Sequence, residues 1–298
     1  MASSTRAFVS PSARQTLEPR LGARPLYSRL LGNQAAVVGL AIVGIFVLLA
    51  LTVQWLPLRD PVQIVAGNRL AGPSWNMPFG GDSLGRDLFS RIVFGARLSL
   101  EVSSKSVTIA LAAGTCLGLL AGYAGGWIDQ IIMRTMDVLF AFPAVLLALG
   151  IVAALGPDPN NVIIAIGVVY TPIFARVVRA PVLALKEREF VDAARGLGAR
   201  ASRIIVRHIL PNLLSVLVVQ ASIALSWAVL TEASLSFLGL SAQPPAASWG
   251  VMLNDGRQAL ELAPHLAIFP GLAIMLAVLG FNLLGDGLRD VLDPRLRR

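Results

Sequence analysis

Charged residues are scarce in this sequence. Only 14% of its 298 residues are charged and 55% are hydrophobic, whereas an average soluble domain has about 25% charged residues. A water-soluble fold needs enough polar side chains to cover its surface. The composition therefore argues against an ordinary soluble domain.

Lysine is nearly absent, and its two positions exclude one kind of nucleotide site. A P-loop needs Gly-Lys followed by Ser or Thr, because the lysine must reach the terminal phosphates. Here Lys105 follows Ser104 and Lys186 follows Leu185. Any ATP hydrolysis that serves this protein must therefore come from a separate chain.

Cysteine and histidine are equally rare. Cys116 is the only cysteine, and His208 and His265 stand far apart without a second ligand at metal-site spacing. There is no Gly-x-Ser-x-Gly elbow either. We therefore expect no catalytic residue, no metal site and no cofactor bound by this chain, which excludes a membrane-embedded enzyme.

Six long apolar runs are the main positive feature of the sequence. A helix of about 20 apolar residues crosses the hydrocarbon core, where backbone groups must be paired within the helix. The sequence predicts an all-α polytopic membrane protein whose six transmembrane helices lie within residues 35–56, 98–122, 131–155, 162–185, 213–240 and 264–285. The first run lacks a cleavage site and is interpreted as an anchor.

The basic residues are distributed unevenly between the predicted loops. With the N-terminus in the cytoplasm, 18 basic residues lie inside and six outside. The positive-inside rule then places both termini in the cytoplasm, with residues 1–34 as a tail, 57–97 as an outer loop and 187–211 as an inner loop. The net charge of +8 is thus explained by a membrane, and we expect no nucleic acid partner.

The inner loop keeps helical periodicity despite its polarity. Phe190, Val191, Ala194 and Leu197 fall on one face, which predicts two short amphipathic helices hinged at Gly198. Ser202 is the expected cap of the second helix, and Pro211 fits the first turn of the fifth span. On these grounds alone, the pair either docks on a protein or lies in the lipid headgroups.

A resemblance favours protein docking. Asp192-Ala193-Ala194, Gly198 and the ending Leu210-Pro211 resemble the EAA loop of ABC importer permeases, which carries a coupling helix that docks on the ATPase subunit. Asp192 replaces the usual glutamate, and His208 replaces a branched apolar residue. The resemblance implies ATPase-coupling roles for Glu189, Asp192, Ala193, Ala194, Gly198, Arg203, His208 and Pro211.

A second resemblance precedes the second span. Asp82 is the expected cap of a helix on the outer surface, with Asp87 paired to Arg91. The segment resembles the Gly-Thr-Asp-x-x-Gly-Arg-Asp signature of the second permease subunit of dipeptide, oligopeptide and nickel importers, with Gly81 in the threonine position. The residues concerned are Gly81, Asp82, Gly85, Arg86, Asp87, Ser90 and Arg91, which either seal the channel mouth or contact a binding protein.

Few charges fall inside the apolar runs. Glu101 and Lys105 have the favourable acid-first spacing for an ion pair near the interface. Glu232 and Ser236 lie in the fifth run, in a stretch that resembles the family's signature and continues through Ser248-Trp249-Gly250 in an outer loop. They either line a pore or gate, or form a structural polar contact. Glycines and prolines within the spans are interpreted as packing features.

The resemblance implies a type I ABC permease fold in residues 35–298. It implies a partner set of a second homologous permease, two ATPase subunits or domains that hold ATP and Mg, and an extracytoplasmic solute-binding protein. The location would be the plasma membrane of a bacterium or archaeon, and peptides are the expected cargo, with glutathione or nickel chelates open. A secondary transporter is the alternative, although the sequence shows no convincing internal repeat.

Overall fold

The computed structural model describes residues 30–292, so most of the expected N-terminal tail and the last six residues lie outside the described part. This part is helical and forms no β-strand, only two isolated bridges. The principal helices are α2 (Gln34–Thr52), α3 (Leu88–Ala124), α4 (Gly126–Phe140), α5 (Ala144–Leu155), α6 (Pro159–Leu185), α7 (Glu189–Gly196), α8 (Ala201–Ile204), α9 (Leu210–Phe237), α10 (Trp249–Gln258) and α11 (His265–Leu292). Two short segments, η2 (Ala66–Asn68) and the π-helical η3 (Ile205–Ile209), complete the described chain.

Each apolar run lies on a helix, but α3 begins at Leu88, ten residues before the predicted second span, and the third run is broken. Five helices within residues 30–292 are long and apolar enough to cross a membrane. The third run is not one straight helix, because α4 and α5 meet at an angle of 91°. Pro143 stands at the break, where its ring removes a backbone donor and disfavours helical geometry in the residue before it.

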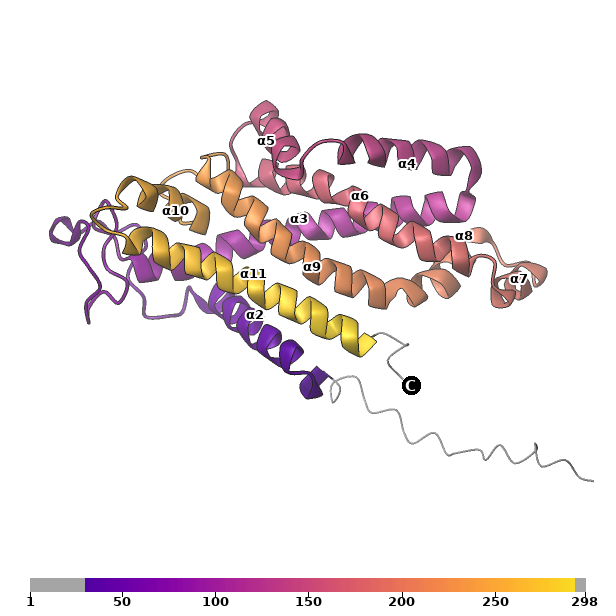
Figure 1. Cartoon of the computed structure of the whole chain (residues 1–298), viewed down its shortest axis with the longest axis horizontal. Helices are drawn as coiled ribbons and strands as arrows, with labels where there is room; N and C mark the ends of the chain where they lie inside the picture. Colours follow the sequence, from indigo (N-terminus) through magenta and orange to yellow (C-terminus); the bar gives the residue numbers. More distant parts are fainter. Residues whose placement is uncertain (1–29, 293–298) are drawn as a thin grey trace, which may run out of the picture.

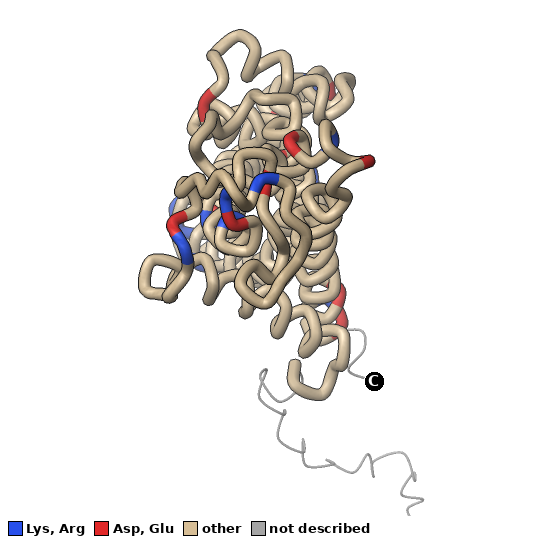
Figure 2. Tube along the Cα trace, turned by 90° about the vertical axis from the view of Figure 1, so that its left-hand side faces the viewer, with Lys and Arg blue, Asp and Glu red and all other residues tan. Residues whose placement is uncertain are grey.

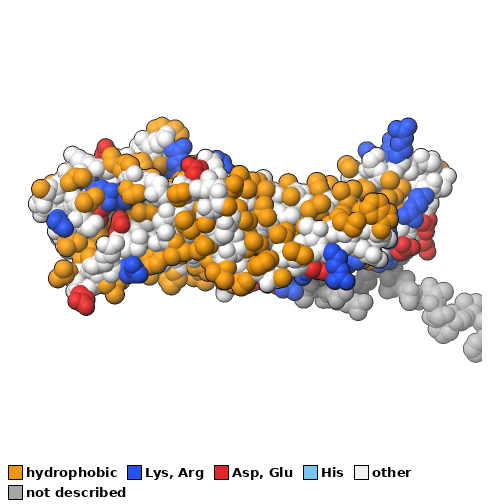
Figure 3. All heavy atoms as spheres, turned by 90° about the horizontal axis from the view of Figure 1, so that it is seen from above, with side chains coloured by type: hydrophobic (Ala, Val, Ile, Leu, Met, Phe, Trp, Pro, Cys, Tyr) orange, Lys and Arg blue, Asp and Glu red, His pale blue; other side chains and the backbone are white. Residues whose placement is uncertain are grey.

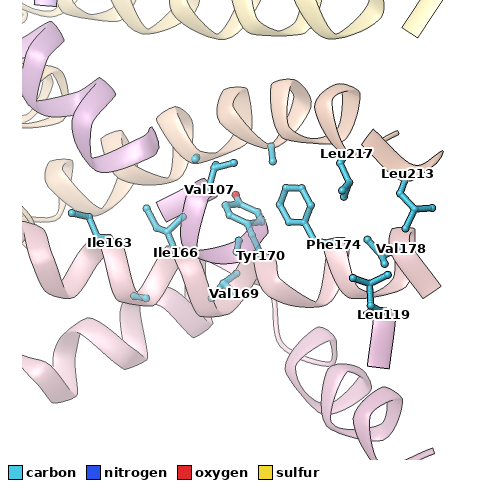
Figure 4. Close-up of a cluster of buried hydrophobic side chains, with 14 of the residues drawn as sticks. Val107, Leu119, Ile163, Ile166, Val169, Tyr170, Phe174, Val178, Leu213 and Leu217 are labelled. Atoms are coloured by element: carbon cyan, nitrogen blue, oxygen red, sulfur yellow. The ribbon is translucent and has the colours of Figure 1, made fainter. Parts of the chain in front are cut away.

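The main core lies between α3, α6 and α9. Side chains of α6, including Ile166, Tyr170 and Phe174, fill the space between the other two helices (Figure 4). Gly118 of α3 lets the two backbones approach closely, because an added Cβ would lie 2.5 Å from the carbonyl oxygen of Ala175. Gly114 and Gly122 meet α6 in the same way, so the glycines of this span are packing features.

A second core joins α3, α9, α10 and α11. Trp249 is fully buried there, and its indole Nε1 donates a hydrogen bond to the carbonyl oxygen of Ile92 at 3.0 Å. Residues 248–250 are therefore not part of an extended outer loop. Ser248 caps α10, and Trp249 and Gly250 form its first turn.

The first turn of α2 and the last turn of α11 lie side by side and point toward the side of the molecule on which α7 lies, although α7 projects well beyond them (Figure 1). Asn33, just before α2, donates from Nδ2 to Asp290 Oδ2 near the end of α11 at 3.1 Å. The opposite end holds α10 and the loop that connects α2 to α3 (Figure 1). This arrangement matches an even number of crossings, while the side on which the ends lie stays a prediction.

The kind of side chain on the surface changes from one end of the long axis to the other. A belt of hydrophobic side chains covers the middle, and most charged side chains gather toward the two ends (Figure 3). Viewed from the end that carries α10, acidic and basic positions lie next to each other (Figure 2). A belt of this kind suits a protein surrounded by lipid.

Candidate functional site

Asp82 is the centre of a buried polar cluster at the α10 end. Its Oδ1 accepts hydrogen bonds from the backbone N–H of Leu84 at 2.8 Å and of Arg86 at 2.9 Å. Its Oδ2 accepts from Arg86 Nε at 2.6 Å and lies 3.5 Å from Arg91 Nε. Asp82, Arg86 and Arg91 are all at most 5% exposed, so the carboxylate is surrounded by donors rather than by water.

The helix cap in this segment differs from the prediction. Asp87, not Asp82, precedes the first turn, and its Oδ2 accepts from the backbone N–H of Ser90 at 3.0 Å. Arg91 approaches Asp82 rather than Asp87 and donates to the Pro61 carbonyl at 3.0 Å. The helix does not lie on the outer surface, because it is the buried start of α3.

The backbone conformation explains why glycine occupies two positions of this segment, Gly81 and Gly85. Gly85 has a φ of +84°, which side-chain-bearing residues rarely adopt. An added Cβ at Gly81 would lie 2.0 Å from the Asn68 carbonyl oxygen, so the position where the family signature has threonine admits only glycine in this loop conformation. Together these contacts fix the outer loop against the start of α3.

Helix α10 closes the cluster from the other side. Asp255 Oδ2 lies 3.9 Å from Arg86 Nη2. Burial raises the pKa of the Asp255 carboxyl above its ordinary value, while Arg91 and Arg86 oppose that shift. Asp82, Arg86 and Arg91 are buried, whereas the Asp255 side chain is 33% exposed. A seal at the channel mouth and contact with a binding protein both stay predictions.

The inner loop forms the expected helix and hinge. After α7 the chain turns at Gly198, whose φ of +77° requires glycine, and its N–H donates to the Arg195 carbonyl at 2.9 Å. Val191 and Ala194 are buried against the main core. Leu197 does not share their face, because it is 89% exposed.

The predicted ATPase-coupling residues lie on α7, at the hinge and along the helix that follows it. Asp192 pairs with Arg195 at 3.0 Å on the surface, and Ala194 is buried beneath it. The other exposed members are Glu189, Ala193, Gly198, Arg203 and Pro211, while His208 is half-buried. The ring of His208 lies 6.4 Å from that of Phe190.

The second short helix is the beginning of the fifth span rather than a separate unit. α8 starts at Ala201, so Ser202 lies inside the helix and is not its cap. The helix continues through the π-turn of η3 into α9, where Pro211 occupies the first turn as predicted. Pro211 has no N–H to donate to the carbonyl one turn earlier, and this missing donor accounts for the wider hydrogen-bond spacing of η3.

Glu232 and Ser236 lie inside the protein rather than on an open surface. Both are at most 1% exposed, and Ser236 Oγ donates to Glu232 Oε1 at 2.6 Å. Within residues 30–292 the second carboxyl oxygen, Oε2, has no hydrogen-bond partner. In this conformation they form a structural polar contact, and a role in a gate stays a prediction.

The sequence interpretation missed two ion pairs that join α4 to α6. Arg179 holds Asp129 through two hydrogen bonds of 2.6 Å, and Arg176 donates to Asp137 at 2.6 Å. The partners are 50 and 39 positions apart, so no local spacing indicated them. Among the described residues no three His, Cys, Asp or Glu side chains converge as metal ligands.

These features define the class of protein. A bundle of apolar spans, a buried charged cluster at one end and a hinged amphipathic helix at the other are those of a membrane transport subunit. The chain belongs to the family of binding-protein-dependent transport system inner membrane components, whose model matches residues 114–298. It is a permease subunit of an ABC importer.

Curated relatives are similar over almost their whole length. The dipeptide transport system permease protein of Alkalihalophilus pseudofirmus is 50% identical over 274 residues, which cover 92% of this chain and 90% of the relative. The glutathione transport system permease protein of Pectobacterium atrosepticum is 49% identical over 279 residues, which cover 92% and 91%.

A solved structure supports the fold. A chain of the MetNI methionine ABC transporter in inward-facing conformations has a TM-score of 0.55 at 20% identity. The match covers 69% of this chain and 98% of that one. At this identity the match shows that the two chains share a fold.

Proposed function

We propose that this chain forms half of the translocation pathway of a peptide importer. A second homologous permease would supply the other half, and a solute-binding protein would deliver the cargo from outside. Two ATPase subunits or domains, which hold ATP and Mg, would dock on the coupling loop, residues 187–211. The names of the dipeptide and glutathione relatives support a small peptide as cargo.

The coupling loop is the observation that carries this proposal. α7 projects on the side of the molecule toward which both described chain ends point (Figure 1). Its inner face is anchored by Val191, which is fully buried, while Leu197 and Phe190 expose 89% and 42% of their surface. Such a helix presents apolar side chains to a partner while it remains fixed to the core.

The loop is also mechanically connected to the spans. Ala199 N–H donates to the Ala194 carbonyl at 3.0 Å across the hinge, and the helix from Ala201 runs on to Phe237 as one span. A movement imposed on α7 would therefore pass directly into α9. This is the connection that an ATP-driven change of the pathway requires.

The location follows from the same arrangement. We place both termini and α7 in the cytoplasm of a bacterial or archaeal cell and the Asp82 end outside, with the belt in the plasma membrane. The charge distribution of the loops supports this orientation.

The test compares two glycines of the loop in the reconstituted importer. Gly198→Pro abolishes the positive φ, whereas Gly196→Ala adds a methyl that meets no atom of residues 30–292 within 4 Å. We expect Gly198→Pro to weaken docking of the ATPase subunits and to lower peptide uptake by at least about tenfold, with Gly196→Ala equal to wild type. Asp192→Arg should act like Gly198→Pro. Normal uptake by both coupling variants would contradict the proposal.

A further inference from the structure

Part of the exposed surface of α3 differs from the exposed surfaces of α2 and α11. Between residues 37 and 51 of α2 and between residues 268 and 279 of α11, the large exposed side chains are apolar: Val37, Val38, Leu40, Ile45, Val47, Leu48 and Leu51, and Ile268, Leu272, Met275, Leu276 and Leu279. α3 exposes Ile109 and Leu120 as well, but between residues 101 and 108 its exposed side chains are Glu101, Ser104, Lys105 and Thr108, which we call the polar face. A lipid environment explains the first two surfaces and leaves this one unexplained.

The polar face is continuous along the helix. Residues three, four and seven positions apart share one side of an α-helix, and Glu101, Ser104, Lys105 and Thr108 have this spacing. Lys105 Nζ donates to Glu101 Oε1 at 2.5 Å, yet the two side chains remain 56% and 46% exposed. The face therefore presents a cation and an anion to its surroundings.

The polar face extends into the depth of the membrane. Glu101 and Ser104 line an open hollow of about 670 Å³ together with Ala50, Leu51 and Trp55 at the end of α2. That hollow places Glu101 level with the outer end of a 19-residue apolar span. α3 runs inward from there, and a rise of 1.5 Å per residue puts Thr108 about 10 Å deeper.

Polar side chains at that depth require water or protein rather than lipid. Resting on the proposed function, we propose that the polar face of α3 lines the aqueous translocation pathway. Cargo that enters from outside meets the Glu101–Lys105 pair first and then the hydroxyls. A zwitterionic peptide suits such a lining, because Lys105 attracts its carboxylate and Glu101 its ammonium group.

The test measures water access to one position of this face. Thr108→Cys and, as a matched control, Met275→Cys on the apolar face of α11, which is 53% exposed, are made in a Cys116→Ser background. The assembled importer in membranes is treated with a charged, membrane-impermeant methanethiosulfonate, which reacts with the thiolate and therefore needs water at the site. Modification is timed in the nucleotide-free state and in the ATP-trapped state.

We expect Thr108→Cys to react at least about tenfold faster than Met275→Cys in one state or both, and the modification to block peptide uptake. Equal rates at the two positions in both states would overturn the proposal, and so would uptake that survives modification of Thr108→Cys. Partners and uptake are checked before labelling. A failure of labelling in an active, assembled importer counts against this assignment alone, whereas a chain without ATPase partners counts against the proposed function.

Discussion

The carboxylate of Asp82 holds the guanidinium of Arg86 at 2.6 Å, with both side chains almost completely buried. Arg91 approaches the same oxygen at 3.5 Å. Asp82 is therefore the nearest carboxylate to two buried cations where the outer loop meets α3, with Asp255 farther away at 3.9 Å from Arg86.

Removing that carboxylate charge should destabilise the protein strongly. We expect Asp82→Asn to lower the free energy of unfolding by about 3–5 kcal/mol, because the two guanidinium groups lose their shared anion. The midpoint of thermal unfolding of the purified importer measures this effect. Glu261→Gln, at an exposed acid, is the control and should leave the midpoint unchanged. Equal midpoints for both variants would show that the cluster is not stabilising.

Two glycines should respond in opposite ways to substitution by alanine, because only Gly118 lies at the contact between α3 and α6, whereas Gly44 lies in open space on α2. An added Cβ at Gly118 lies 2.5 Å from the Ala175 carbonyl oxygen, so Gly118→Ala should destabilise by about 1–3 kcal/mol through overpacking. At Gly44 in α2 the added methyl meets no atom of the described chain within 4 Å, and alanine should stabilise the helix by up to about 1 kcal/mol. Thermal unfolding of the two variants should thus shift in opposite directions.

Most of the fold could be predicted because it depends on local composition. In a bilayer, an apolar run such as residues 35–56 forms a helix, because a helix pairs all its backbone polar groups within the segment. The break between α4 and α5 could not be derived in this way. Pro143 can either kink a helix or end it, and the 91° turn depends on packing against α6 that the sequence does not state.

Residue pairs were harder to predict than elements. The Asp87–Arg91 spacing fits an ion pair on an isolated helix. In the structure Arg91 lies next to Asp82 instead, because the loop folds back onto α3. Leu197 fits the apolar face of α7 by periodicity, yet the helix ends one residue earlier and the chain turns away. The spacing of residues within one helix does not indicate such contacts, because they form between segments that are distant in the sequence or where the chain turns.

The buried pair in α9 predicts a contrast between two serines of one helix. Ser236→Ala removes the hydroxyl that donates a hydrogen bond to Glu232 Oε1 at 2.6 Å. The substitution should destabilise the protein by about 1–3 kcal/mol, because it leaves a buried polar group unpaired. Ser234 donates only to its own helix at Leu230, so Ser234→Ala should change little. Chemical denaturation of the two variants measures the difference, and equal stabilities would remove Glu232 from the structural account.

The orientation predicts which ends of the molecule meet which solvent. In a Cys116→Ser background, Trp75→Cys in the outer loop and Arg289→Cys near the end of α11 are both exposed positions. An impermeant maleimide should label Trp75→Cys in right-side-out vesicles and Arg289→Cys in inverted ones. The reverse pattern would place the termini outside and the coupling loop out of reach of ATP.

The most direct test of the central claim is purification of the tagged chain from its native membranes in mild detergent, with identification of the co-purifying proteins by mass spectrometry. The account predicts a second permease and ATPase subunits, with the ATPase lost from Gly198→Pro or Asp192→Arg and retained by Gly196→Ala. Recovery of the chain alone, with transport that needs no ATP, would contradict the account and favour a secondary transporter.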